Sequence, residues 1–152
     1  MPGKIAINNL QEAREFLGTY FDFHDSEVQN IEIRFKGQVV ESAKMTIIKV
    51  HGPSVDEYLQ GTRHLGFVPG VRPVNRTLQI EFADVIAVTF SSSYSTHSAL
   101  PGRKGTVWVI MHVFASQVDG SIKWEFDLVA ENAPQNPYPV IIFGSAEVTE
   151  LL

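Results

Sequence analysis

The stretch that decides the fold is TVWVIMHVFASQVDGSIKWEFDL, residues 106–128. Its second half alternates between apolar and charged residues, which is the pattern of a strand with one buried face. The apolar members are Ile122, Trp124, Phe126 and Leu128. Before them, Asp119-Gly120 is the dipeptide expected in a tight two-residue turn. The stretch therefore predicts an antiparallel hairpin.

The first half, 106–114, is the most hydrophobic strand of the chain and is predicted to lie centrally in a sheet. It is expected to bury side chains on both faces. One face takes Val107, Val109, Met111 and Val113, and the other takes Trp108, Ile110 and Phe114. His112 shares the phase of Trp108, so we interpret it as a core histidine whose ring has a hydrogen-bond partner.

Two-residue periods recur on both sides of the hairpin. They predict further strands at 31–36, 43–50, 78–82, 85–90 and 140–148. Within 43–50 the apolar phase changes, which indicates a β-bulge near Ile47. The run 85–90 fits either a hairpin partner of 78–82 or a kinked extension of it.

One helix is predicted near the start of the chain. Asn9 can cap it, Glu12 can reach back in a capping box, and Gly18 suits a left-handed stop. Its apolar stripe is Leu10, Ala13, Phe16 and Leu17. The predicted fold class is mainly β, or α+β by strict count. It is a curved antiparallel sheet or sandwich of about seven strands with one N-terminal helix, in a single domain over residues 1–152.

Residues 52–76 are predicted to form an irregular insertion, because they contain four glycines and three prolines. Ser54 and Glu57 have capping-box spacing, so a short helix over 54–60 that stops at Gly61 is expected. A second loop, 91–105, is rich in serine. Long loops are often functional, and apolar residues beside arginines are typical of interaction hot spots. The candidate binding residues are Arg63, Leu65, Phe67, Arg72, Tyr94 and His97.

Composition narrows the functional classes. The chain has 152 residues, no cysteine and a formal net charge of −5. The lack of cysteine removes disulfides and thiolate zinc sites and favours a cytoplasmic location. The negative charge disfavours nucleic acid and anionic membranes as partners. No apolar run approaches the roughly 20 residues of a membrane span, and the first residues do not form a secretory signal.

His24 and Asp25 stand side by side in FDFHDSEVQNIEIRF, residues 21–35, at the entrance to a strand. Such a pair can bind a metal ion or transfer a proton, and it can equally cap a turn. With His51 and His64 it forms the alternative prediction of a metal site. The histidines lack the spacings of recognised ligand pairs, and no phosphate-binding glycine motif occurs. No cofactor is therefore expected under the main hypothesis.

Two strings carry a resemblance to known proteins. FHDSEV, residues 23–28, leads into an Ile-Glu-Ile strand, and in LQIEFADVIAVTF, residues 78–90, a strand ends in Phe82, Asp84 and Val85. In these strings the chain resembles small, mostly β bacterial domains, including some immunity-protein families of toxin systems. The resemblance implies an inhibitor that binds a protein, and it brings no catalytic residues with it. The insertion 52–76 departs from that pattern.

Two functional hypotheses follow. The first is a non-catalytic protein-interaction domain, immunity-like in the form that the resemblance favours, which binds a protein partner or a second copy of itself as a homodimer. Its contact surface would be the loops 52–76 and 91–105. The alternative is a small metal-dependent hydrolase or ligand-binding enzyme that uses His24, Asp25 and a loop histidine.

Overall fold

The computed structural model describes residues 3–61, 75–89, 108–129 and 138–152. The helices in these ranges are α1 (Leu10–Thr19) and α2 (Val55–Leu59), and a 3₁₀ turn, Phe21–Phe23, follows α1. The strands are β1 (Ile5–Ile7), β2 (Glu27–Lys36), β3 (Val39–His51), β4 (Asn75–Ala83), β5 (Ala87–Thr89), β6 (Trp108–Val118), β7 (Ser121–Val129), β8 (Val140–Phe143) and β9 (Ser145–Leu151). Neither helix is long and apolar enough to cross a membrane.

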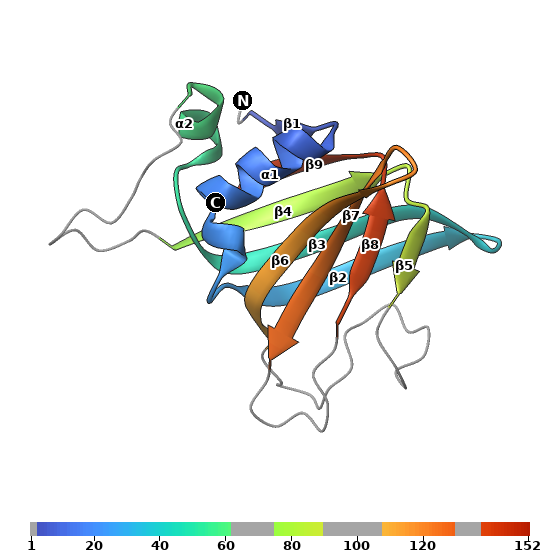
Figure 1. Cartoon of the computed structure of the whole chain (residues 1–152). Coiled ribbons are helices and arrows are strands. Elements are labelled where there is room, and N and C mark those ends of the chain that lie inside the picture. The colour runs from blue at the N-terminus through green and yellow to red at the C-terminus, as the bar shows by residue number, and fades with distance from the viewer. Residues whose placement is uncertain (1–2, 62–74, 90–107, 130–137) are drawn as a thin grey trace, which may run out of the picture.

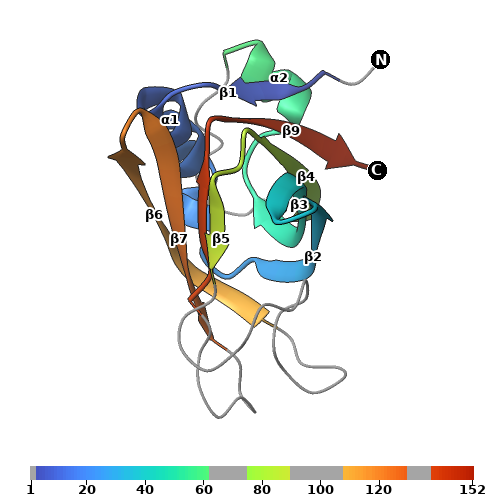
Figure 2. The same ribbon diagram turned by 90° about the vertical axis from the view of Figure 1, so that its right-hand side faces the viewer.

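The strands form one open antiparallel sheet in the order β1-β9-β4-β3-β2-β6-β7-β8-β5. The sheet bends between β2 and β6, where only Glu27 and Val28 of β2 pair with β6. Its two halves therefore lie face to face, with β2, β3, β4 and β9 in one layer and β6, β7 and β8 in the other (Figure 1, Figure 2). The mainly β, antiparallel fold class predicted from the sequence is confirmed.

The sheet has nine strands among the described residues, two more than the approximate number of seven that the sequence predicts. One of the additional strands is β1, whose three residues are too few for a two-residue period to be recognised. The predicted strand 140–148 is broken at Gly144, since β8 pairs with β7 whereas β9 pairs with β4. The run 85–90 is neither a hairpin partner nor an extension of β4, because β5 pairs with β8 in the other half.

The predicted hairpin of β6 and β7 is confirmed. Val118 pairs with Ser121, and the turn residues Asp119 and Gly120 have φ angles of 47° and 83°, as a type I′ turn requires. The alternation in β7 is also confirmed, because its four apolar side chains from Ile122 to Leu128 are all buried. The hairpin thus supplies one wall of the core.

The faces predicted for β6 are wrong beyond Ile110. The pairing of β6 with β7 shifts register between Ile110 and His112. This bulge turns Val113 into the core, whereas Met111 and Phe114 are exposed. The strand itself is interior to the sheet as predicted, between β2 and β7, and residues 106–107 lie outside the described part of the chain.

Trp124 of β7 lies at the centre of the core, where its side chain is fully buried. Its ring centroid is 5.7 Å from that of Phe82 in β4 and 5.4 Å from that of Phe143 in β8, both edge to face. Phe16 of α1 stacks on it at 6.3 Å. Both halves of the sheet and the first helix therefore meet at one side chain.

Helix α1 begins where the sequence predicts and ends later. Asn9 caps it, since its side-chain oxygen accepts a hydrogen bond from the Glu12 backbone N–H at 2.8 Å. The stop predicted at Gly18 is wrong, because the helix continues through Thr19 to a cap at Tyr20. Thr19 and Tyr20 are both buried, so their packing stabilises the last turn of the helix although Gly18 has a low helix propensity.

Two local predictions in the middle of the chain are confirmed. A register shift follows Ile47 in β3, and Lys49 within it has a φ of 58°, as expected for a bulge. Ser54 and Glu57 form a reciprocal capping box at the start of α2. Gly61, with a φ of 99°, follows the helix.

Arg76 of β4 holds α2 against the sheet. Its Nε donates to the carbonyl oxygen of Gly52 at 2.9 Å, and its Nη1 donates to Glu150 of β9 at 3.1 Å. Its Nη2 lies 3.6 Å from the Glu57 carboxylate. The second oxygen of Glu150 accepts a hydrogen bond from the Val55 backbone N–H at 3.0 Å. The guanidinium of Arg76 therefore links β4 to β9, to α2 and to the segment that precedes α2.

This arrangement predicts that Glu57 stabilises the fold by an amount that decreases in acid. Hydrogen bonds from the Ser54 backbone and hydroxyl, and then the charge of Arg76, hold the pKa of Glu57 below its ordinary value, although burial opposes them. Because the folded pKa is the lower one, ionised Glu57 stabilises the fold above the unfolded pKa, and this stability is lost as pH falls through the folded pKa. Glu57→Gln should therefore lose less stability than the wild type between about pH 6 and about pH 3. Urea unfolding at each pH measures this, and parallel profiles would contradict it.

Candidate functional site

Four strands carry charged side chains in one row on the outer face of the sheet. Glu32 of β2 is opposite Lys44 of β3, which is opposite Glu81 of β4, which in turn is opposite Glu147 of β9. Directly opposite residues of antiparallel strands share a face, and their neighbours along each strand point to the other one. The row is thus a consequence of strand register.

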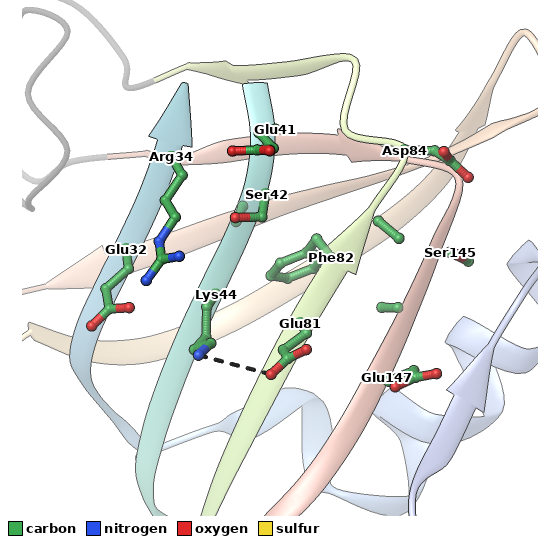
Figure 3. A pocket seen from close by; sticks show the side chains of 13 residues that line it. Glu32, Arg34, Glu41, Ser42, Lys44, Glu81, Phe82, Asp84, Ser145 and Glu147 are labelled. Atoms are coloured by element: carbon green, nitrogen blue, oxygen red, sulfur yellow. Dashed lines mark ion pairs between the residues drawn. The ribbon is translucent and has the colours of Figure 1, made fainter. Parts of the chain in front are cut away.

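A groove of about 600 Å³ lies over this row (Figure 3). Small residues, among them Ser42, Ala83 and Ser145, line it between the charged side chains. Its charged residues are the carboxylates Glu32, Glu41, Glu81, Asp84 and Glu147 and the cations Arg34 and Lys44. The groove therefore carries more negative than positive charge.

The ion pairs in the groove leave part of this negative charge uncompensated. Lys44 Nζ lies 3.8 Å from the Glu81 carboxylate, as the dashed line in Figure 3 marks, and Lys4 Nζ lies 3.4 Å from that of Glu147. Glu32, Glu41 and Asp84 form no ion pair with any residue that the structure describes. Three carboxylates of the groove therefore have no counter-charge among the described residues.

The binding residues predicted from the two loops cannot be compared with this groove. Arg63, Leu65, Phe67, Arg72, Tyr94 and His97 all lie outside the described residues, as does His64. They stay predictions. The described residues of the groove were missed by sequence reasoning, since each of its charged residues alone has the pattern of a solvated strand face.

His24 and Asp25 form an exposed pair. His24 Nδ1 lies 3.1 Å from Asp25 Oδ2, and the two side chains are 51% and 68% exposed. Across the described ranges, no three histidine, aspartate or glutamate side chains gather in a way that could hold a metal ion. His51 lies in β3, and its Nδ1 is buried without a described partner. The backbone N–H of Asp25 donates a hydrogen bond to the carbonyl oxygen of Ile110 at 2.9 Å. This bond holds the turn that contains His24 and Asp25 against β6.

The turn before this pair has an unusual backbone. Phe21, Asp22 and Phe23 have φ angles of 57°, 53° and 57°. Residues with a Cβ atom are disfavoured in this left-handed region, by about 1–2 kcal/mol each. Phe23 is fully buried against Phe16, with ring centroids 5.6 Å apart, and this packing offsets the backbone cost.

The structure brings together a second histidine–carboxylate pair that the sequence did not indicate. His112 Nδ1 lies 3.4 Å from Asp22 Oδ2, in a cleft of about 230 Å³ that Arg14 and Phe114 also line. The prediction that His112 is a core residue is wrong, because the bulge after Ile110 leaves its side chain 41% exposed. The described lining of the cleft includes no hydroxyl or thiol side chain.

The chain was compared with protein-family models, with curated proteins and with solved structures, and no match was found in any of the three comparisons.

Proposed function

We propose that this chain is a non-catalytic protein-interaction domain, and that the groove on the outer face of β2, β3, β4 and β9 holds a basic segment of a protein partner. The observation that carries the proposal is the charge of the groove, in which five carboxylates face two cations. A segment rich in lysine and arginine is complementary to it, whereas nucleic acids and anionic membranes are repelled.

The shape of the groove supports the same ligand. Small residues such as Ser42, Ala83 and Ser145 leave room between the charged side chains. The aliphatic stems of lysine and arginine can lie along such a surface while their charged ends reach the carboxylates. Charge complementarity of this kind contributes mainly to association rate and specificity.

A narrower form of the proposal is an immunity-like inhibitor whose partner is a basic toxin domain. It is supported by the resemblance of residues 23–28 and 78–90 to immunity-protein families. A cytoplasmic location belongs to the same proposal and is supported by the lack of cysteine. The alternative of a metal-dependent hydrolase has less support, because His24 and Asp25 have no third ligand among the described residues.

Reversing two charges in the groove tests the proposal. A fluorescent peptide of alternating lysine and alanine serves as the probe, and its binding is measured by anisotropy at about 0.1 M salt, where the Debye length is about 10 Å. Glu41→Lys/Glu81→Lys should weaken binding about tenfold, since several exposed ion pairs become repulsive. Added salt should weaken wild-type binding as well.

The matched control is Glu125→Lys/Asp127→Lys, which makes the same change in net charge on β7 in the other half of the sheet. This variant should bind the peptide nearly as tightly as the wild type, because exposed charges beyond a Debye length are largely screened. An equal loss in both variants would mean that only the overall charge attracts the peptide, and the groove would not be the site.

A further inference from the structure

Strand β2 has an edge that the other described strands pair with only in part. On one side it pairs with β3 along its whole length, and on the other it pairs with β6 only at Glu27 and Val28. A bulge at Gln29 then bends the strand, and among the described residues no strand continues along 29–36. Backbone groups on such an edge are available to another strand.

The sequence of this edge is complementary to itself. Residues 30–36 are NIEIRFK, with Ile31, Ile33 and Phe35 on one face and Glu32 and Arg34 on the other. If two copies pair antiparallel about Ile33, Glu32 of each lies opposite Arg34 of the other, and Ile31 lies opposite Phe35. Opposite charges and apolar side chains in facing positions both stabilise antiparallel pairs.

We infer that the chain forms a two-fold symmetric homodimer through antiparallel pairing of β2 with β2 of a second copy, centred on Ile33. The two sheets become one continuous sheet across the dimer axis. This inference goes beyond the proposed function and does not depend on it.

The exposure of the side chains supports a second copy as the occupant. Phe35 is 54% exposed, and pairing brings it beside Ile31 of the other copy, whose side chain is already buried in its own core. Glu32 and Arg34 are exposed, and Arg34 has no ion pair with a described residue. Charges on an edge strand usually prevent pairing, but here their spacing about Ile33 makes them partners.

The charges also select one register. Pairing centred on Glu32 places the two Glu32 side chains face to face, and pairing centred on Arg34 does the same with the two arginines. Like charges directly opposite each other are destabilising. A shift by a single residue in one strand turns the apolar face of one copy to the charged face of the other.

Two charge-reversal variants of β2, studied separately and as a mixture, test the inference. Sedimentation velocity over a range of concentrations should show a dimer for the wild type. Glu32→Arg and Arg34→Glu should each weaken dimerisation about tenfold or more, because both contacts about the axis become repulsive. An equimolar mixture of the two variants should form a heterodimer, since every facing pair is again of opposite charge.

The control is Glu81→Arg, which places a like charge beside Lys44 as Glu32→Arg does, but on β4, away from the edge. It should leave the dimer unchanged and weaken binding of the lysine peptide, so the two proposals fail separately. A monomeric wild type at all concentrations would overturn the inference, as would single variants that dimerise normally or a mixture that does not associate. Circular dichroism verifies that each variant is folded.

Discussion

Replacing Trp124 with alanine will lower the free energy of unfolding by about 4 kcal/mol, the cost of a large cavity in a packed core. The side chain is fully buried, and it contacts aromatic rings from α1, β4 and β8. No other described element can fill the space without moving one half of the sheet toward the other. In a domain of this size the midpoint of thermal unfolding should fall by roughly 10 °C. Urea unfolding and thermal circular dichroism measure both quantities.

Trp124→Phe is the matched control and should cost about 1–2 kcal/mol. Phenylalanine retains most of the ring contacts, and the buried indole N–H of Trp124 has no hydrogen-bond partner among the described residues. Its removal therefore breaks no observed bond. Phe114→Ala, at a half-exposed aromatic residue of the neighbouring strand, should cost less than either. If the phenylalanine variant were as unstable as the alanine variant, the indole nitrogen rather than ring packing would be the important feature.

The parts of the fold that could be predicted depend on signals between near neighbours in the sequence. The turn at Asp119 and Gly120, the cap at Asn9 and the capping box at Ser54 each need only a few adjacent residues, and all three are confirmed. The bulge after Ile110 has no such signal, because continuous apolar residues look the same in either phase. The pairing of β5 with β8 depends on contacts between distant segments, which periodicity does not contain.

The candidate site was harder to predict than the fold for the same reason. Glu32, Lys44, Glu81 and Glu147 come from four strands and lie in one row only because of the register between those strands. The proximity of Asp22 to His112 likewise requires the turn after α1 to pack on β6. Composition revealed the excess of negative charge but not its location, and the same local charge pattern fits a solvated face equally well.

Replacing Arg76 with alanine will lower the free energy of unfolding by about 3 kcal/mol, because it removes the cation from a partly buried network and leaves a carboxylate behind. The side chains of Arg76 and Glu150 are only 15% and 14% exposed. Without the guanidinium, Glu150 keeps its bond from the Val55 backbone but loses its counter-charge, and the Gly52 carbonyl loses a donor. Helix α2 should detach first, and hydrogen exchange at α2 amides should accelerate more than at β7 amides.

Two variants separate the network from a simple ion pair. Lys4→Ala removes an ion pair with Glu147 whose side chains are more than half exposed, and it should cost well under about 1 kcal/mol. Arg76→Lys keeps the charge, but a single ammonium group lacks the planar fork that reaches Gly52 and Glu150 together, so it should recover only part of the loss. Full recovery with lysine would show that charge alone holds α2. An alanine cost as small as that at Lys4 would show that water replaces the network and that α2 is held by apolar packing of Val55 and Tyr58 instead.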